Sequence, residues 1–178
     1  MPRPDTRPDT RADTSPDTLP GTRPDTLRTV TLGRLDEGVY LARNPRGGQL
    51  RFGSHAEVDF TPVELLLAAV AGCSAVDVDV VTGRRAPAEQ FEVTARAHKV
   101  PTDGGGSALR DIEVTFTVRF SDDAAGDAAR AVLPRALKAS HDRTCTVSRT
   151  IEAGTPVLVR LEGDDAGLPQ PLSDTPRP

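Results

Sequence analysis

The sequence predicts an α+β fold with antiparallel sheets, and two observations lead to that prediction. Strand-like segments are grouped before and after a helical segment, whereas a doubly wound fold alternates strand and helix throughout. The helical segment, residues 60–81, carries capping residues at its start and a long uncharged stretch behind them. We therefore expect two helices set among six strands, with the first helix at the centre.

A meander of short antiparallel strands is expected before this helix. Its pieces are separated by GRLDEG and RNPRGG, which are rich in turn-forming residues. The expected strands cover residues 29–32, 39–42 and 50–52. The meander also carries Arg34, Arg43, Arg46 and Arg51, and most arginines in such positions are solvated surface residues.

The central helix begins at residues that suit a helix N-terminus. Thr61 can accept a hydrogen bond from a free backbone N–H group, Pro62 needs no donor there, and Glu64 completes a capping box. Residues 65–76 carry no charge, a pattern typical of a helix enclosed on all sides. This apolar run is too short for a transmembrane span, and Asp77 and Asp79 keep it from extending further. We therefore expect a buried helix of a soluble protein and no membrane partner.

Two longer strands and a second helix are expected next. Residues 91–98 and 111–120 alternate apolar and polar side chains, which predicts a hairpin with one face on the core. Residues 122–139 form a helical pattern that Pro134 either kinks or breaks in two. A last strand is expected at Val157, Val159 and Leu161. Because one sheet face cannot enclose an apolar helix, we expect a homodimer whose central helices pack between two sheets.

Both ends of the chain are expected to lie outside the folded domain. Residues 1–26 repeat PDTR and its variants, and this proline-rich, apolar-poor repeat predicts a disordered tail. We expect the domain over residues 27–163 and a flexible tail over residues 164–178.

The net charge of −4 and the aromatic content of 3% argue against binding to nucleic acid. No apolar leader segment lies near Met1, so a cytoplasmic location is expected.

The strongest candidate chemistry belongs to the two cysteines, Cys73 and Cys145. Such residues are often small core hydrophobes, and that alternative stays open. His141 precedes Cys145 by one helical turn, which would place an imidazole on the face of that thiol in a helix. Asp77 follows Cys73 by one turn, and a carboxylate there would raise the pKa of the thiol and lower its reactivity. A reactive Cys73 therefore needs a cation, and we expect an arginine of the meander, oriented by Asp77.

Other chemistries find little support. Two cysteines without a CxxC or HxxxH pair are a poor nucleus for zinc, and His55 and His98 carry no ligand pattern. No phosphate loop, dinucleotide-binding motif or GxSxG elbow is present, so we expect no metal and no cofactor. Glu64 lies near the opposite face of the helix from Cys73, so its expected role is capping.

Two motifs together resemble a known family. The stretches TPVELLLAAVAGCSAVDV and SHDRTCTVS are similar to the cysteine motifs of the OsmC/Ohr family of thiol-dependent organic hydroperoxide reductases. The similarity is greatest with the YhfA-type branch and covers residues 28–163. The resemblance implies an α+β fold with a long central helix, formed as an intertwined homodimer with two active sites at its interface.

The resemblance also implies a mechanism. Cys73 matches the peroxidatic cysteine, whose thiolate attacks the O–O bond of an organic hydroperoxide, releases an alcohol and becomes a sulfenic acid. Cys145 matches the resolving cysteine, which condenses with that sulfenic acid to form an intramolecular disulfide. An external dithiol reductant of the lipoyl type would then reduce the disulfide. No metal, haem or flavin is implied.

One part of the family pattern differs in this sequence. Arg51, in an Arg–Phe pair before the helix, matches the family's arginine and is expected to stabilise the Cys73 thiolate. The family's paired glutamate falls on Val63, so we infer that Asp77 orients the arginine instead. Because that glutamate is missing, a non-catalytic module that binds a small hydrophobic ligand or senses oxidation stays an alternative.

Overall fold

The computed structural model describes residues 26–54 and 60–159, and the chain divides after Asp59 into two units. Nearly all of the expected N-terminal tail and all of the expected C-terminal tail lie outside the described residues.

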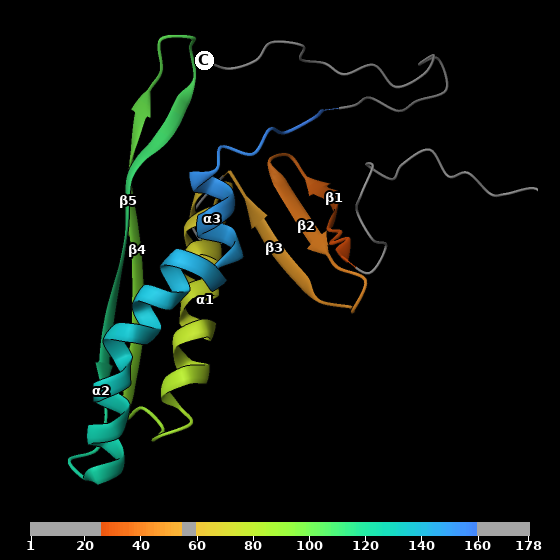
Figure 1. Cartoon of the computed structure of the whole chain (residues 1–178). Coiled ribbons are helices and arrows are strands. Elements are labelled where there is room, and N and C mark those ends of the chain that lie inside the picture. The colour runs from red at the N-terminus through yellow and green to blue at the C-terminus, as the bar shows by residue number, and fades with distance from the viewer. Residues whose placement is uncertain (1–25, 55–59, 160–178) are drawn as a thin grey trace, which may run out of the picture. The chain divides into compact units, whose positions relative to one another are not determined.

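The first unit contains a three-stranded antiparallel sheet (Figure 1), which confirms the predicted meander. Its strands are β1 (Thr31–Asp36), β2 (Val39–Arg43) and β3 (Gln49–Gly53), in the order β1-β2-β3. Asn44 closes the second turn, because its Oδ1 accepts hydrogen bonds from the backbone N–H groups of Arg46 at 2.9 Å and Gly48 at 3.1 Å. The rings of Tyr40 and Phe52 stack with centroids 5.8 Å apart, and Phe52 is buried.

The second unit begins with the central helix α1 (Pro62–Thr82). Its capping box is formed, because Thr61 Oγ1 accepts from the N–H of Glu64 at 3.3 Å and Glu64 Oε2 accepts from the N–H of Thr61 at 2.7 Å. These bonds to Thr61 hold the pKa of the Glu64 carboxyl below its usual range. The predicted helix start and the capping role of Glu64 are confirmed.

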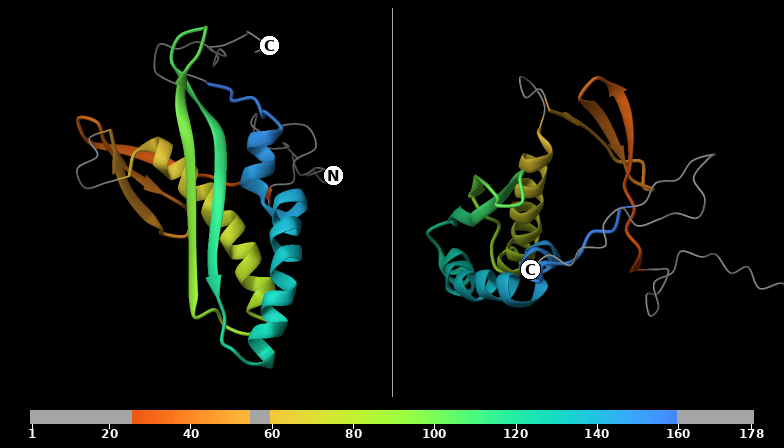
Figure 2. Two further views of the ribbon diagram at one scale, coloured as in Figure 1. Left: turned by 90° about the vertical axis from the view of Figure 1, so that its left-hand side faces the viewer. Right: turned by 90° about the horizontal axis from the view of Figure 1, so that it is seen from above.

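A long antiparallel hairpin of β4 (Gln90–Pro101) and β5 (Ser107–Arg119) follows α1. Side chains alternate between half-buried and exposed along most of both strands, so the predicted hairpin with one covered face is confirmed. In the left-hand view of Figure 2 the hairpin passes in front of α1, and α2 (Ala124–Ala139) lies to the right of the hairpin. A small core of Ala86, Phe120 and Ala129, with Val118 and Leu133 packed against it, joins one end of β5 to α2.

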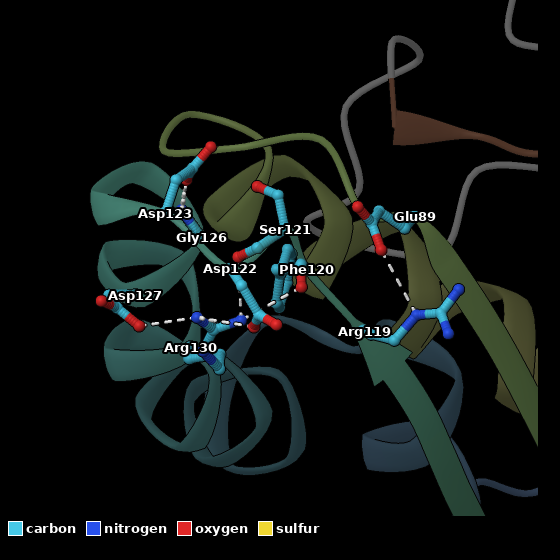
Figure 3. Close-up of polar contacts among 9 residues, drawn as sticks. All are labelled: Glu89, Arg119, Phe120, Ser121, Asp122, Asp123, Gly126, Asp127 and Arg130. Carbon is cyan, nitrogen blue, oxygen red and sulfur yellow. Dashed lines mark hydrogen bonds and ion pairs between the residues drawn. The ribbon is translucent and has the colours of Figure 1, made fainter.

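The start of α2 is a tightly bonded corner (Figure 3). The Oδ1 atom of Asp123 accepts a hydrogen bond from the N–H of Gly126 at 2.8 Å. A Cβ atom on Gly126 would lie 1.9 Å from the carbonyl oxygen of Ser121, so this corner requires glycine. Arg130 donates to the carbonyl oxygens of Phe120 and Ser121, both at 3.1 Å. These bonds fix the direction in which α2 leaves β5.

The α2 helix is continuous although it contains Pro134. Of the two predicted alternatives, a break into two short helices is therefore wrong. The chain then forms a π-helical turn, η2 (Ser140–Thr144), and a short helix, α3 (Thr146–Glu152), neither of which the sequence patterns predicted.

The predicted last strand is wrong over the residues that the structure describes. Residues 155–159 have no regular structure, and Val157 is 79% exposed. Within the described residues, β4 and β5 pair only with each other, and residues 155–159 form no ladder with either of them. Leu161 lies outside the described residues.

The α1 helix is less enclosed than its composition predicts. Its buried residues are Val70, Ser74, Val78 and Thr82, which recur at every fourth position and form a single face. Three other apolar residues, Leu66, Val76 and Val80, are 40%, 64% and 52% exposed. Within one chain the hairpin and α2 cover only one side of the helix, and its enclosure on all sides in a homodimer stays a prediction.

By length and composition alone, α1 could also cross a membrane. Among the described residues it is the one helix of this kind: an 18-residue apolar stretch of it has a mean hydropathy of 1.8, and 17% of that stretch is buried. The core helix of a soluble protein can have the same length and composition, and α1 packs against β4 and α2.

Candidate active site

Cys73 lies in the middle of α1 and is partly exposed. At about 100° per residue, Leu66, Val76 and Val80 fall within about 80° of one another around the helix, and Cys73 lies between them. We call these three apolar residues the open stripe of α1. The sequence therefore places the Cys73 thiol on an apolar surface that this chain leaves exposed.

Cys145 has a different environment, because it is fully buried and caps the N-terminus of α3. Its Sγ atom accepts hydrogen bonds from the backbone N–H of Ser148 and from the hydroxyl of Ser74, both at 3.4 Å. The Ser148 hydroxyl oxygen lies 3.1 Å from the same sulfur. Ser74 follows Cys73 on α1, so this contact links the two cysteine segments.

The structure brings the two cysteines together as free thiols, and each shifts the pKa of the other. Burial raises the pKa of the Cys73 thiol, and the neighbouring Cys145 thiol adds to this rise. Hydrogen bonding to the backbone N–H groups of Val147 and Thr146 opposes the rise without cancelling it. In this chain, Cys73 is therefore the less acidic thiol.

Cys145 is shifted in the opposite direction. Burial by itself would raise the pKa of its thiol, but hydrogen bonds from Ser148, Ser74 and Cys73 outweigh the burial and hold the pKa below its ordinary value. The two thiols therefore differ in both exposure and acidity. Cys73 is partly exposed and its thiol pKa is raised, whereas Cys145 is buried and its thiol pKa is lowered.

Asp77 fastens the segment that precedes Cys145 to the central helix. Its Oδ2 atom accepts hydrogen bonds from the Ser140 hydroxyl at 2.9 Å and the Thr144 hydroxyl at 2.7 Å. Because Asp77 lies one turn after Cys73, these bonds hold η2 close to the thiol pair. The sequence patterns missed this role, and the expected pairing of Asp77 with an arginine stays a prediction.

The imidazole predicted on the face of the Cys145 thiol lies elsewhere. His141 is exposed, and its Nδ1 atom is 3.6 Å from Oε1 of Glu152. The N–H of Cys145 bonds to the carbonyl of Ser140, five residues earlier, so the π-helical turn replaces the α-helical spacing on which the prediction rested. The predicted common face of His141 and Cys145 is wrong.

Arg51, the expected cation of the site, lies on β3 in the first unit and is exposed. Its approach to the Cys73 thiolate stays a prediction. Among the described residues, no group of three or more His, Cys, Asp or Glu side chains is placed to hold a metal ion.

A cavity of about 760 Å³ lies within the second unit. Its apolar lining includes Val70, Phe116 and Leu137, which come from α1, β5 and α2. Ser74 and Ser148 also line it, whereas neither cysteine does. The hydroxyls of these serines therefore stand at the boundary between the cavity and the buried sulfur of Cys145.

No sequence pattern predicted the hydroxyl groups of Ser74 and Ser148 that contact the Cys145 sulfur. One signal was available for Ser148, because a residue three positions after a helix cap often bonds to it, and Ser148 has that spacing from Cys145. Ser74 carried no such signal, since its contact with Cys145 depends on the packing of α1 against α3.

Comparison with known proteins shows the family to which this chain belongs. Residues 53–160, more than half of the chain, match the family described as OsmC-like protein. The chain belongs to the OsmC-like family. The predicted family and α+β fold are thereby confirmed, while its YhfA-type branch stays a prediction.

Curated relatives and solved structures agree with this assignment. The OsmC-like chain is 33% identical over 136 residues to the uncharacterized protein Rv2923c of Mycobacterium tuberculosis (strain ATCC 25618 / H37Rv), across 72% of this chain and 90% of that protein. A hypothetical protein from Aquifex aeolicus VF5 is 20% identical, with a TM-score of 0.57, across 72% of this chain and 89% of that one. An OsmC-like protein of unknown function from Vibrio cholerae is 11% identical, with a TM-score of 0.58, across 71% and 94%. At these identities the two structures support the fold alone.

Proposed function

We propose that the protein is a thiol-dependent peroxidase that reduces organic hydroperoxides to alcohols. The observation that carries this proposal is the pairing of the partly exposed Cys73 thiol with the sealed Cys145 thiol, close enough to shift each other's pKa. A peroxide can reach Cys73 from solvent, whereas Cys145 meets only the oxidised form of Cys73. Membership of the OsmC-like family supports the same chemistry.

The reaction uses the two cysteines in sequence. The Cys73 sulfur attacks one oxygen of the hydroperoxide, the O–O bond breaks, and the other oxygen leaves as an alkoxide that gains a proton to give the alcohol. Cys73 is then a sulfenic acid. The Cys145 sulfur attacks Cys73, the S–O bond breaks, and water leaves as the disulfide forms. An external dithiol, of the lipoyl type in our proposal, returns both residues to thiols.

The open stripe of α1 suggests where the organic part of the substrate binds. Leu66, Val76 and Val80 surround Cys73 with apolar surface, which favours a carbon-rich hydroperoxide over hydrogen peroxide. Because the pKa of Cys73 is raised, its thiolate needs a cation, and Arg51 with Asp77 orienting it is our choice for that role. The proposal places the protein in the cytoplasm, as a homodimer that completes the site.

Thiol counting after a stoichiometric dose of cumene hydroperoxide tests the proposal. We expect rapid loss of two thiols per chain in the wild type and recovery of both with dihydrolipoamide. Cys73→Ser should block the loss, whereas Cys145→Ser should lose one thiol and accumulate a sulfenic acid that dimedone traps. Thiol loss no faster than that of free cysteine would contradict the proposal.

The cavity supports a second candidate function, a non-catalytic module that binds a small apolar ligand. Its volume of about 760 Å³ lies in the range typical of small-molecule sites. Leu137→Trp would fill part of it, so ligand binding should fall while thiol loss with cumene hydroperoxide stays at the wild-type rate. Two results together would favour the module over the enzyme. The Leu137→Trp variant would bind less ligand than the wild type, and the wild-type thiols would react with cumene hydroperoxide no faster than free cysteine.

A further inference from the structure

The cavity of about 760 Å³ in the second unit has a lining that separates by polarity. Its buried and half-buried residues either are apolar or carry a hydroxyl group. They include Val70, Phe116 and Leu137, and the three serines Ser74, Ser140 and Ser148. Every charged residue of the lining is exposed, so the charges lie where the cavity opens to solvent. A molecule inside the cavity would therefore meet apolar walls and serine hydroxyls.

A β-bulge in β5 shapes one wall of this cavity. Asp111 and Ile112 both lie opposite Ala97 of β4, so β5 has one extra residue at this point. Asp111 has a φ angle of 53°, a left-handed conformation that is uncommon for residues other than glycine. A bulge bends its strand, and bulges occur often beside functional sites. Because Asp111 and Ile112 both line the cavity, the irregular part of β5 lies at the cavity wall.

The serine hydroxyls define which polar group the interior can bind. Ser140 donates its proton to Oδ2 of Asp77 at 2.9 Å, and Ser74 donates its proton to the Cys145 sulfur at 3.4 Å. Each of these two oxygens keeps lone pairs that can accept a hydrogen bond from a ligand. Ser148 lies 3.1 Å from the same sulfur, and a neutral Cys145 thiol can donate to it, which leaves the Ser148 proton available. The best ligand group is therefore one that both donates and accepts a hydrogen bond.

The charged residues at the opening provide no net positive charge. They are Arg110, Asp111, His141 and Glu152. The two carboxylates offset Arg110, and the Nδ1 atom of His141 is 3.6 Å from Oε1 of Glu152. A carboxylate ligand therefore gains little attraction here, and an ammonium ligand would lose its water against apolar walls. Both considerations favour an uncharged ligand.

We propose that this cavity binds a small uncharged alcohol, whose hydroxyl group donates to Ser74 and accepts from Ser148. These two serines contact the same sulfur, so they lie close together, and the apolar part of the alcohol fills the space between α1, β5 and α2. The inference deepens the second candidate function, because it names the class of ligand. The proposed peroxidase also releases an alcohol, and only that link rests on the peroxidase, since the binding itself requires no peroxide.

A nuclear magnetic resonance titration of the full chain tests the proposal, because amide shifts report both the affinity and the residues contacted. Cumyl alcohol is the probe, and tert-butylbenzene, in which a methyl group replaces the hydroxyl, is its matched partner. Both compounds should shift the amides of Val70 and Phe116. Ser74→Ala and Ser148→Ala should each weaken the binding of cumyl alcohol about fivefold, as expected for one hydrogen bond, and change that of tert-butylbenzene by no more than about twofold.

Two controls accompany this titration. Thr82 lies on α1 and is buried like Ser74, but its hydroxyl donates to the carbonyl of Val78 and is not part of the cavity lining. Thr82→Val should therefore bind cumyl alcohol with the wild-type affinity. The binding of tert-butylbenzene shows directly whether the cavity of each serine variant is intact. Cumylamine, and the analogue with a carboxylate in place of the hydroxyl, should bind at least about tenfold more weakly than the alcohol at neutral pH.

The proposal is overturned if either serine substitution leaves the affinity for cumyl alcohol unchanged, if a charged analogue binds as tightly as the alcohol, or if the shifted amides lie outside the cavity. Failure of the peroxidase is a separate result. Alcohol binding that depends on both serines, in a protein whose thiols react with cumene hydroperoxide no faster than free cysteine, would support the inference and contradict the peroxidase. Rapid loss of two thiols in a protein that binds no alcohol would contradict the inference alone.

Discussion

Asp77 shows at the scale of a single residue how a carboxylate can serve a thiol site without touching a thiol. Both of its hydrogen bonds reach hydroxyls of η2, the turn that leads into Cys145. One of these hydroxyls belongs to Ser140, which is 2% exposed and therefore depends on Asp77 for its partner. The position of the Cys145 sulfur thus depends on a residue one turn away from Cys73.

We predict that Asp77→Ala lowers the free energy of unfolding by about 1–3 kcal/mol, because it leaves the buried Ser140 hydroxyl without its acceptor. Disulfide closure after oxidation should also become slower, since η2 is no longer fastened to α1. Urea denaturation and stopped-flow thiol chemistry measure the two effects.

Asp79→Ala is the matched control for this prediction. Asp79 lies on the same helix and is exposed, and within the described residues its carboxylate has no hydrogen-bond partner. Its removal should change stability by no more than about 0.5 kcal/mol. Equal losses in the two variants would contradict the anchoring role of Asp77.

At the scale of secondary-structure elements, the corner between β5 and α2 decides how the second unit closes. Asp123 caps the helix, Arg130 bonds two carbonyl oxygens of the corner, and Gly126 lets the backbone of Ser121 approach closely. The same corner holds the small core around Phe120. A defect here should therefore affect the whole second unit.

We predict that Gly126→Ala destabilises the protein by about 2 kcal/mol or more, because its Cβ would meet the carbonyl oxygen of Ser121 at 1.9 Å and neither backbone segment can yield easily. Thermal unfolding followed by circular dichroism measures the loss. Gly104→Ala provides the control, since a Cβ there meets no atom within 4 Å and should leave the melting temperature almost unchanged. A wild-type melting temperature for Gly126→Ala would show that the corner can relax.

The elements with strong local signals could be predicted from the sequence. The Thr61 capping box, the alternation along β4 and β5 and the turns of the meander all depend on neighbours in the chain. The predicted strand at Val157 was wrong because a strand also needs a partner, which alternation alone does not supply. The η2 turn and α3 were missed because short elements carry too few residues for a periodic pattern.

The site was predictable only in part, for a related reason. Motif resemblance singled out Cys73 and Cys145, and the structure brings these residues together. The hydroxyls of Ser74, Ser140 and Thr144 were not predictable, because each acts across a contact between elements distant in sequence. His141 was placed wrongly, since a π-helical turn changes the spacing that the prediction assumed.

At the scale of the whole molecule, the exposed apolar residues of α1 need an explanation. Leu66, Val76 and Val80 lie on the long central helix, where an exposed apolar surface is costly in water. A second copy of the same chain is the partner that we propose, because the sequence of α1 is that of an enclosed helix while the single chain encloses only one face. Cys73 lies between these residues, so such a dimer would also shape the approach to the thiol.

We predict that the wild-type protein has twice the chain mass of 18.9 kDa in solution, and that Val76→Asp or Val80→Asp reduces it to the single-chain mass. A carboxylate buried at an apolar interface without a partner costs several kcal/mol, whereas on an exposed helix face it costs little. Ala128→Asp introduces the same charge on an exposed position of α2 and should leave the dimer intact. Sedimentation equilibrium measures the masses, and a single-chain mass for the wild type, or a dimer that survives both stripe substitutions, would contradict this assembly. If the dimer shapes the site, the two stripe variants should also lose most of their reaction with cumene hydroperoxide, while Ala128→Asp keeps it.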